Sequence, residues 1–488
     1  MVEINTHPPA QNEIKSGLEI HQQLDTHKLF CNCPSVLRSD EPDFEINRRL
    51  HAVAGEGGEV DIAAEFEAVQ DREFIYQGYD TTCLIELDEE PPRLINEEAL
   101  RTGLHIAMLL NCEILPIAQI MRKTVVDGSN TSGFQRSVLI ARDGYVETSG
   151  GRVGIGSVYL EEDSARAIKE EDGKKVFRVD RLGIPLVEIQ TEADIKSPEQ
   201  AKEVALHLGD ILRSCKVKRG IGTIRQDVNV SIEGHPRVEI KGFQDVKMFI
   251  PVIENEVKRQ EAGLKKGGNN KPTHPPLRSE VRNALVDGST EFLRPMPGSA
   301  RMYPETDLPL LRITREMINR AKKSLPKLRG EVRKDLVKKG LREDEISLLL
   351  KGDGLEEFES LLKIINEPRF VFKVLIEIPK DVGGRSGKDV SEILTLDVIE
   401  SIVGLVSEGR LDRSDVKHVM EEIVNGKSFD DAVKLEKVDL GEIESEIVKL
   451  IKEKPGLSMG GYMGLIMKEF KGKVSGGEVS EILKKLVG

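Results

Sequence analysis

The sequence of 488 residues predicts an α+β domain with a mixed or antiparallel sheet, followed by an all-helical domain and a small helical tail domain. Short segments that alternate apolar and polar residues, such as 224–234 and 235–243, recur through the first half of the chain and indicate strands. Asp-Gly pairs, as at 127–128 and 143–144, separate these segments and indicate turns. From about residue 314 onward the pattern becomes charged and helical, and the chain is longer than one core usually holds.

Helices are interleaved with the strands of the first domain, and the clearest of them begins after Ser197. Ser197 is a suitable N-cap, Pro198 fits the first helical position, and Gln200 completes a capping box. An apolar stripe of helical period follows at Ala201, Val204, Ala205, Leu208, Ile211 and Leu212. This segment is therefore expected to form a helix with one buried face.

Glycine and proline mark the end of the first domain. Residues 264–276 contain Gly-Gly-Asn-Asn and three prolines, which is typical of a linker or a loop tip. Prolines at 295, 297, 304 and 309 then predict irregular structure. The predicted organisation is a first domain over 1–263, a linker with a proline-rich segment over 264–311, a helical domain over 312–430 and a tail domain over 431–488.

The composition, with 39% apolar and 32% charged residues, indicates a soluble globular protein. The most apolar long segment, 106–120, is too short to span a bilayer, and the first residues lack a secretory signal, so no membrane partner is expected. Five cysteines are too few for a disulfide framework, which favours the cytoplasm. The net charge of −13 argues against indiscriminate binding of nucleic acid.

One strongly basic run contrasts with this negative average. Residues 320–342 contain ten basic side chains against two acidic ones, Glu331 and Asp335. Such a run is either a solvated helix face or a binding surface for a polyanion, and composition alone favours the solvated face.

Four strand-like stretches of the first domain carry acidic residues at apolar positions. They contain Glu19 with His21, the run of Glu161, Glu162 and Asp163, then Glu188, and finally Asp227. Buried carboxylates need a partner or a cation, and several carboxylates with one imidazole suit Mg²⁺ or Mn²⁺ better than zinc. The alternative is a set of internal salt bridges with Arg178, Arg181, Arg225 and Lys241.

The Cys-x-Cys pair of Cys31 and Cys33 is a weaker metal signal. Tetrahedral zinc needs four ligands, and only Cys83 offers a further thiol nearby. Buried structural thiols are therefore favoured, and no zinc is expected. The sequence also lacks a P-loop and a G-x-S-x-G elbow. No cysteine is placed beside a histidine as a glutaminase nucleophile would be, so the chain is not expected to release ammonia from an amide donor.

Longer stretches of the chain are specific enough to indicate a family. They are GLEIHQQLDTHKLFCNCP, LEED, VDRLGIPLVEIQTEADIKSPEQA, RQDVNVSI and VEIKGFQ. Together they resemble the B/E family of amidotransferase subunits, whose members convert misacylated glutamyl-tRNA(Gln) to glutaminyl-tRNA(Gln). The segments RPMPGSARMYPETDLP and TTCLIELDEEPP are similar to the archaeal E branch rather than to the bacterial B branch.

The resemblance implies a cradle-shaped catalytic domain that acts as an ATP-dependent kinase and transamidase. With ATP as a substrate and Mg²⁺ as the cofactor, it would phosphorylate the γ-carboxylate of the glutamyl group, and ammonia would then displace phosphate. By motif match the Mg²⁺ ligands are Glu19, His21, Glu162 and Glu188, and Asp227 is a further catalytic carboxylate. Candidates for contacts with ATP or with the acyl end are Arg122, Lys123, Glu239 and Lys241.

The same resemblance implies partners. Ammonia would arrive from an asparaginase-like D-type subunit, in a hetero-oligomer of two D and two E subunits, and the RNA partner would be Glu-tRNA(Gln). The helical domain and the tail would contact this tRNA, which favours the polyanion interpretation of the basic run. The candidate tRNA contacts are Arg320, Lys322, Lys323, Lys327, Arg329, Lys468, Lys471 and Lys473.

One departure from the family pattern concerns an inserted domain. Members of the E branch carry a domain that resembles one in bacterial aspartyl-tRNA synthetases, and only residues 265–288 stand in its place here. The chain is therefore expected to lack this domain, which puts any tRNA discrimination assigned to it in doubt. Two alternative functions are a non-catalytic tRNA-binding scaffold protein and a bacterial B-type enzyme that acts on Asp-tRNA or Glu-tRNA.

Overall fold

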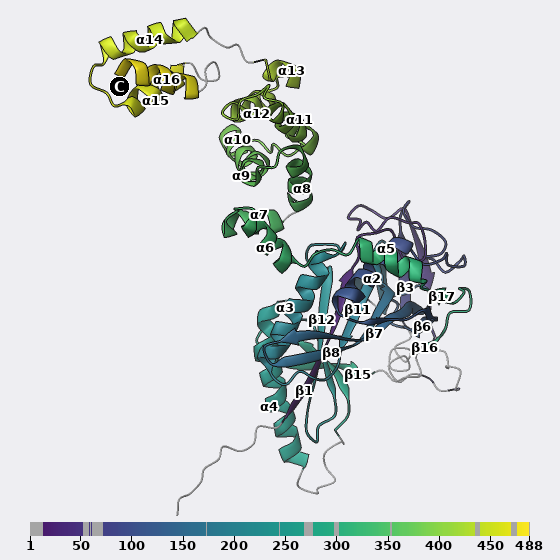
Figure 1. Cartoon of the computed structure of the whole chain (residues 1–488). Helices are drawn as coiled ribbons and strands as arrows, with labels where there is room; N and C mark the ends of the chain where they lie inside the picture. The colour runs from purple at the N-terminus through teal and green to yellow at the C-terminus, as the bar shows by residue number, and fades with distance from the viewer. Residues whose placement is uncertain are drawn as a thin grey trace, which may run out of the picture. The chain divides into compact units, whose positions relative to one another are not determined.

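In the computed structural model of the chain, the described residues are 13–51, 58, 60, 72–171, 173–243, 245–267, 277–296, 302–351, 354–434, 440–469 and 476–487. The chain divides into two compact units, Met1–Arg329 and Gly330–Gly488 (Figure 1). Each unit has its own buried apolar core, so each is described by itself.

The first unit is built on a large mixed sheet, which has eleven strands within the described residues. Neighbouring strands are antiparallel except for one parallel pair, β13 with β14. The predicted α+β fold with a mixed or antiparallel sheet is therefore confirmed. In spatial order the strands are β15 (Thr290–Pro295), β14 (Glu280–Ala284), β13 (Val238–Lys241), β12 (Ile224–Ile232), β1 (Ile14–Gln23), β11 (Pro185–Thr191), β8 (Gly151–Glu162), β7 (Phe134–Thr148), β6 (Ile120–Thr124) and β16 (Met302–Pro304), with β4 (Glu113–Ile114) paired to β7.

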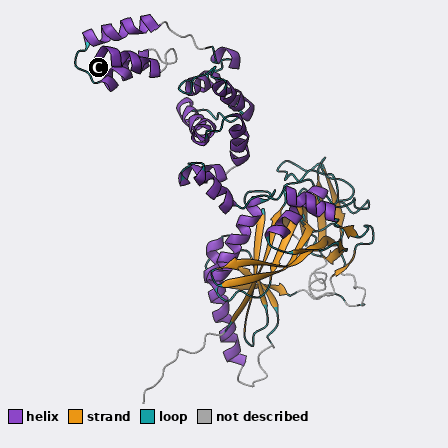
Figure 2. Cartoon of the chain, viewed as in Figure 1, coloured by secondary structure: helices purple, strands orange, loops and turns teal. Residues whose placement is uncertain are grey.

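Helices cover one face of this sheet (Figure 2). Leu104, Leu208 and Ile253, from three different helices, share one buried core with Ile20 of β1 and Ile189 of β11. The opposite face of the same strands is left for polar side chains, because successive strand residues point to opposite faces. The helices of this unit are α2 (Glu97–Leu109), α3 (Pro198–Ser214), α4 (Phe249–Gly267), which follows the short 3₁₀ helix η1 (Val246–Met248), and α5 (Arg315–Lys323).

Helix α3 has the boundaries that its sequence predicts. The Ser197 hydroxyl accepts a hydrogen bond from the Gln200 backbone N–H at 3.1 Å, and Pro198 is the first helical residue. The predicted apolar stripe is buried along its length. The N-cap and the apolar period both agree with the observed helix, which explains why α3 could be predicted from the local sequence.

A second, four-stranded sheet lies in the same unit. Its core contains Phe74, Tyr76 and Phe177, with the rings of Tyr76 and Phe177 stacked at 5.9 Å between centroids. The strands, in spatial order, are β2 (Phe44–Arg48), β3 (Glu73–Gly78), β10 (Lys174–Arg178) and β9 (Arg166–Glu171). A short separate pair is formed by β5 (Ile117–Ala118) and β17 (Leu311–Arg312).

The segment predicted as a linker, 264–311, contributes strands to the large sheet. Strands β14, β15 and β16 all fall within it, and β15 and β16 are the two edge strands. Pro295 and Pro304 are the last residues of these edge strands, where a missing backbone N–H costs no ladder hydrogen bond. Pro297 lies outside the described residues.

The first unit also extends beyond the boundary that the sequence predicts. Helix α5 lies within the range predicted for the helical domain, but its Ala321 is buried in the core of the first unit, against which Met317 and Ile318 also pack. The division between the units falls after Arg329. A helical pattern alone does not reveal which core a helix joins, which is why the sequence placed α5 with the helices that follow it.

The second unit is helical throughout its described residues, as predicted. Residues 336–432 supply one buried core, and a separate small core lies among residues 443–483, consistent with a distinct tail domain. None of the helices in the described parts of the chain is long and apolar enough to cross a membrane. The helices are α6 (Arg329–Lys338), α7 (Glu343–Lys351), α8 (Gly354–Ile364), α9 (Pro368–Phe372), the π-helical η3 (Lys373–Glu377), α10 (Ile378–Ser386), α11 (Leu396–Ser407), α12 (Val416–Val424), α13 (Phe429–Ala432), α14 (Leu440–Glu453), α15 (Met459–Glu469) and α16 (Gly476–Val487).

Candidate active site

A row of charged side chains crosses the middle of the large sheet. His21 of β1 stands opposite Glu188 of β11, and Glu19 of β1 stands opposite Asp227 of β12. Directly opposed residues of neighbouring strands share a face, so these four side chains lie together. Their face is the one left free by the helices, because the alternate residues of the same strands are buried in the helix-covered core.

The register extends the row to the next strands. Tyr159 of β8 stands opposite Glu188, so Glu161, two residues further along, points to the same face. Lys123 of β6 reaches this face beyond β7 and donates to Glu161 Oε1 at 2.7 Å. On the other side of β12, strand β13 adds Glu239 and Lys241. The residues of this charged row are Lys123, Glu161, Glu188, His21, Glu19, Asp227, Glu239 and Lys241.

His21 is the centre of the row. Its Nε2 lies 3.1 Å from Glu188 Oε2, 3.6 Å from Glu19 Oε1 and 4.0 Å from Glu161 Oε2. Lys123 Nζ also approaches Glu188 Oε2, at 3.5 Å. The side-chain amide of Gln190 donates to the other oxygen of Glu188, which fixes the orientation of that carboxylate.

Lys241 forms the other end of the row. Its Nζ lies 2.5 Å from Asp227 Oδ2 and 2.6 Å from Glu239 Oε1. Burial opposes its charge, but the two carboxylates prevail and raise the pKa of Lys241. An amino group thus lies at each end of the row, where it can contact a negatively charged ligand.

The alternative of purely internal salt bridges accounts for only part of this arrangement. Of the four basic residues proposed for it, Lys241 alone pairs with an acid of the charged row. Arg225 and Arg181 face Asp163, at 3.0 Å and 3.8 Å, and Arg178 hydrogen-bonds Gln77. Among the described residues, the five carboxylates of the row form ion pairs with two lysines and one histidine, and the charges of Arg237 and Arg294 also act on Glu239.

The excess of negative charge is reflected in the pKa values of the carboxyls in the charged row. Burial first, and the charge of Glu188 second, raise the pKa of Glu19 to about 7. The same two causes raise the pKa of Glu161. Burial opposes ionisation of Glu188, but Lys123 and His21 hold the pKa of that carboxyl well below its usual range. The raised pKa values of Glu19 and Glu161 mean that protons compete with a divalent ion for these carboxyls.

The centre of the charged row fits a divalent cation. Glu19, His21 and Glu188 each offer one ligand atom, and these atoms lie within 4.8 Å of one another. Carboxylate oxygens with a single imidazole are a donor set for Mg²⁺ or Mn²⁺ rather than for a thiophilic metal. Three of the four Mg²⁺ ligands inferred from the motif thus meet at one point.

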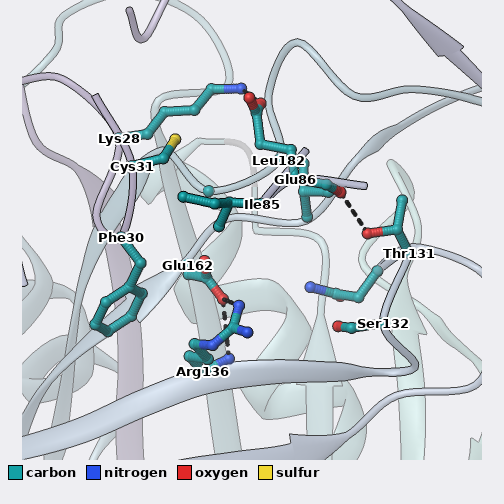
Figure 3. A pocket seen from close by; sticks show the side chains of 12 residues that line it. Lys28, Phe30, Cys31, Ile85, Glu86, Thr131, Ser132, Arg136, Glu162 and Leu182 are labelled. Carbon is teal, nitrogen blue, oxygen red and sulfur yellow. Dashed lines mark hydrogen bonds and ion pairs between the residues drawn. The ribbon is translucent and has the colours of Figure 1, made fainter. Parts of the chain in front are cut away.

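Glu162 and Arg122, both predicted for the site, lie away from the charged row. The Glu162 carboxylate lies 3.4 Å from Nη1 of Arg136, beside a cavity of about 20 Å³ (Figure 3). Arg122 contacts Glu305 at 2.6 Å and Asp307 at 3.0 Å. Each is the immediate chain neighbour of a residue in the row, Glu161 and Lys123, and therefore points to the opposite face.

Sequence reasoning named Glu161 only within the acidic run of residues 161–163 and gave it no role of its own, and it did not name Gln190 as a candidate. The signal for Glu161 was present, because strand alternation from Val158 and Leu160 in the buried core assigns the next residue, Glu161, to the polar face. Gln190 lies two residues from Glu188 on β11 and shares its face by the same rule. The motif match names Glu162, whereas the structure places Glu161 of the two adjacent glutamates on the face of the charged row.

The predicted tRNA contacts are spread over both units. Arg320, Lys322 and Lys323 are exposed at the end of α5, and Lys327 is exposed in the segment that follows. Arg329 is partly buried at the start of α6; burial, Arg213 and Arg219 lower its pKa, which indicates a local concentration of positive charge. Lys468 falls within α15, whereas Lys471 and Lys473 lie outside the described residues.

Two family models match the chain. The GatB/GatE catalytic domain matches residues 14–319, which include the whole charged row, and the GatB domain matches residues 356–487. Similar curated proteins are named as the E-type subunit of glutamyl-tRNA(Gln) amidotransferase. Those of Methanocaldococcus jannaschii, Archaeoglobus fulgidus and Methanococcus vannielii are 36%, 35% and 34% identical, and the alignments cover 97%, 97% and 95% of this chain and 98%, 97% and 96% of the relatives.

The alignments are longer than the chain. The comparison with the M. jannaschii protein spans 618 positions, which exceeds the 488 residues here by 130. That relative therefore has at least this many residues without a counterpart, in agreement with the expected lack of an inserted domain. With a catalytic-domain match over residues 14–319 and relatives at about a third identity along almost the whole chain, this protein belongs to the GatB/GatE family, in the branch of the archaeal E-type subunits of glutamyl-tRNA(Gln) amidotransferase.

Proposed function

We propose that this protein converts Glu-tRNA(Gln) to Gln-tRNA(Gln) in an ATP-dependent reaction. The glutamyl γ-carboxylate attacks the γ-phosphorus of ATP and releases ADP, and ammonia then displaces inorganic phosphate to leave the amide. The names of the relatives support the tRNA substrate and the amidation. The observation that carries the phosphoryl-transfer step is the charged row, in which acidic ligands and two lysines are held on one face of a rigid sheet.

The residues of the charged row would have different roles in such a site. Glu19, His21 and Glu188 would hold Mg²⁺, which when bound neutralises phosphate charge. Gln190 and Lys123 hold the Glu188 carboxylate in position. Lys123 and Lys241, at the two ends, can exchange their carboxylate contacts for phosphate or carboxylate oxygens of substrates without leaving the sheet.

The partners follow from the same proposal. Ammonia is supplied by an asparaginase-like D-type subunit, in an assembly of two D and two E subunits, because nothing in the sequence suggests a nucleophile for releasing it. The acceptor is Glu-tRNA(Gln), contacted in part by the basic residues that end α5 and begin α6. Discrimination among tRNAs would then not depend on the residues of the longer M. jannaschii relative that have no counterpart in this chain.

Divalent cation affinity should rise with pH. Glu19, whose pKa is raised to about 7 by burial and by Glu188, must lose a proton to become a ligand. The raised pKa of His21, where the charge of Glu188 overcomes burial, acts in the same direction. We expect Mn²⁺ affinity, measured by titration calorimetry, to increase at least ~10-fold between pH 6 and pH 8. The Glu19→Gln variant should bind more weakly with a flatter pH profile, and a wild-type affinity independent of pH would contradict the assignment.

One assay separates the proposed enzyme from a scaffold protein. The purified chain is incubated with Glu-tRNA(Gln), Mg²⁺, ATP and free ammonium, and the aminoacyl group is analysed after deacylation. We expect glutamine to form, with ADP, in the absence of any partner. A preparation that binds the tRNA but forms no glutamine would favour the scaffold alternative. Amidation of Asp-tRNA(Asn) at a comparable rate would favour a B-type enzyme.

A further inference from the structure

A second group of polar side chains lies beside the charged row, on the same face of the large sheet. Arg225 of β12 stands directly opposite His21, and Gln23 follows His21 by two residues on β1. Asp163 follows Glu161 by two residues, and its backbone continues the pairing of β8 with β11. Strand alternation therefore places Arg225, Gln23 and Asp163 on the face of the charged row.

Asp163 holds this group together. It is 1% exposed, and its carboxylate accepts from the Gln23 side-chain amide at 2.6 Å and from Arg225 Nη2 at 3.0 Å. The Ser164 backbone N–H donates to the same carboxylate at 2.8 Å. Because three donors hold this buried carboxylate in place, the Arg225 guanidinium has a fixed partner on the sheet.

The Arg225 side chain keeps donors available for a ligand. It is 47% exposed, although the carboxylate that it contacts is buried. Within the described residues Arg225 makes this one ion pair, whereas a guanidinium carries several N–H donors in a planar fork. The remaining donors match the oxygens of a phosphate, which a guanidinium can contact in pairs.

The surroundings of Arg225 are positively charged. Arg181 Nε lies 3.8 Å from Asp163 Oδ1, so one carboxylate faces two guanidinium groups. Arg181 also donates to two backbone carbonyls, at 2.8 Å and 3.0 Å, which ties it to the chain. Burial lowers the pKa of Arg181, and the charges of Arg225 and Arg166 act in the same direction. An anion beside Arg225 would reduce this repulsion between like charges.

Arg225 is also a neighbour of the candidate cation site. Directly opposed residues of antiparallel strands have Cβ atoms about 5 Å apart, so the Arg225 side chain begins close to His21. Strands β1 and β11 lie between β12 and β8 in the sheet, so the guanidinium must extend across the strands that carry the cation ligands to meet Asp163. The two lysines of the row lie at its ends, whereas Arg225 lies along its side.

We propose that Arg225 binds the γ-phosphate of ATP and stabilises the phosphoryl group during transfer, an inference that rests on the proposed function. In this step an oxygen of the glutamyl γ-carboxylate forms a bond to the γ-phosphorus. The bond from that phosphorus to the β,γ-bridging oxygen breaks, and ADP leaves with the electron pair. A guanidinium stabilises the charge that is spread over the phosphoryl and leaving oxygens. Asp163 and Gln23 are then positioning residues, and the Arg225–Asp163 ion pair is more than an internal salt bridge.

Binding of the β,γ-imido analogue of ATP to the intact chain with Mg²⁺, followed by titration calorimetry, tests the inference without turnover. We expect Arg225→Met to weaken binding of the analogue at least ~10-fold. Affinity for Mn²⁺ without nucleotide should stay at the wild-type value, which shows that the charged row is intact. The matched control is Arg152→Met, which removes an exposed guanidinium that pairs with Glu147 at 2.8 Å on the same sheet, and it should bind the analogue normally. Wild-type affinity of Arg225→Met for the analogue would overturn the inference.

Single-turnover kinetics with Glu-tRNA(Gln) then separate this inference from the proposed function. Arg225→Met should lower the rate of ADP and glutamine formation about 10²-fold, and Arg225→Lys should recover little of it, because an ammonium cannot contact two oxygens in the plane of a fork. Added guanidinium ion, below the concentration that unfolds the chain, should partly restore Arg225→Met. A wild-type rate for Arg225→Met, or a defect confined to the KM for Glu-tRNA(Gln), would overturn the inference alone. A wild-type chain that forms no ADP would overturn the proposed function, and the inference with it.

Discussion

Replacing Glu188 by Gln is expected to lower the rate of Gln-tRNA(Gln) formation by about 10³-fold or more, equivalent to about 4 kcal/mol of lost transition-state stabilisation. Glu188 accepts from His21 at 3.1 Å, lies 3.5 Å from Lys123, and is one of three ligands that meet at the cation position. The amide keeps the shape of the side chain but removes the charge that a divalent ion requires. Single-turnover assays with saturating ATP and ammonium would measure the effect.

The matched control for this variant is Glu199→Gln, an exposed residue in the first turn of α3, outside the charged row. It should retain wild-type activity, and both variants should bind tRNA within a few-fold of wild type, because neither residue belongs to the basic segments. A Glu188→Gln protein that amidates at the wild-type rate would remove Glu188 from the cation site, and with it the basis for the phosphoryl-transfer assignment.

The two adjacent glutamates of β8 are expected to respond differently to the same change. Glu161→Gln should lower activity about 10²-fold, because Glu161 holds Lys123 at 2.7 Å and faces His21 at 4.0 Å within the charged row. Glu162→Gln should leave activity within about fivefold. Its cost should instead appear as about 1–3 kcal/mol of lost stability, since Arg136 loses one of its carboxylate partners while buried.

Chemical denaturation and steady-state kinetics on the two variants separate these effects. Arg136 retains Glu305 at 2.8 Å, so the Glu162→Gln protein is expected to fold. The opposite result, with Glu162→Gln inactive and Glu161→Gln nearly wild type, would mean that the motif position rather than the strand pleat identifies the ligand. Equal losses in both would indicate that the two carboxylates act through one shared network.

The local sequence was sufficient to predict those features that a single helix or strand determines. The N-cap, first proline and apolar stripe of α3 are all satisfied within the helix. Glu19 and His21 were assigned to one face because residues two apart on a strand share it, and the structure places both in the charged row. Glu188, an acid within an apolar strand, is explained by the same geometry, since the helices cover only one face of β11.

Features that depend on contacts between distant segments of the chain were harder to predict from the sequence. The choice between Glu161 and Glu162, or between Lys123 and Arg122, depends on which face of the sheet the helices cover. The strands β14 to β16 pair at the sheet edges, where terminal prolines are tolerated. Cys31 and Cys33 come close to Cys83 and Glu86 from a loop about fifty residues away in the sequence, and no local pattern predicts that contact.

The central claim is that a phosphoryl group passes from ATP to the substrate at the charged row. Isotope transfer tests this claim most directly. Glu-tRNA(Gln) labelled with ¹⁸O in the γ-carboxylate is incubated with the chain, unlabelled ATP, Mg²⁺ and ammonium, and the inorganic phosphate is analysed by mass spectrometry. If the carboxylate oxygen attacks ATP and phosphate leaves on displacement by ammonia, each glutamine formed releases one phosphate that carries one ¹⁸O atom. Glutamine formed together with phosphate that contains no ¹⁸O would contradict the account.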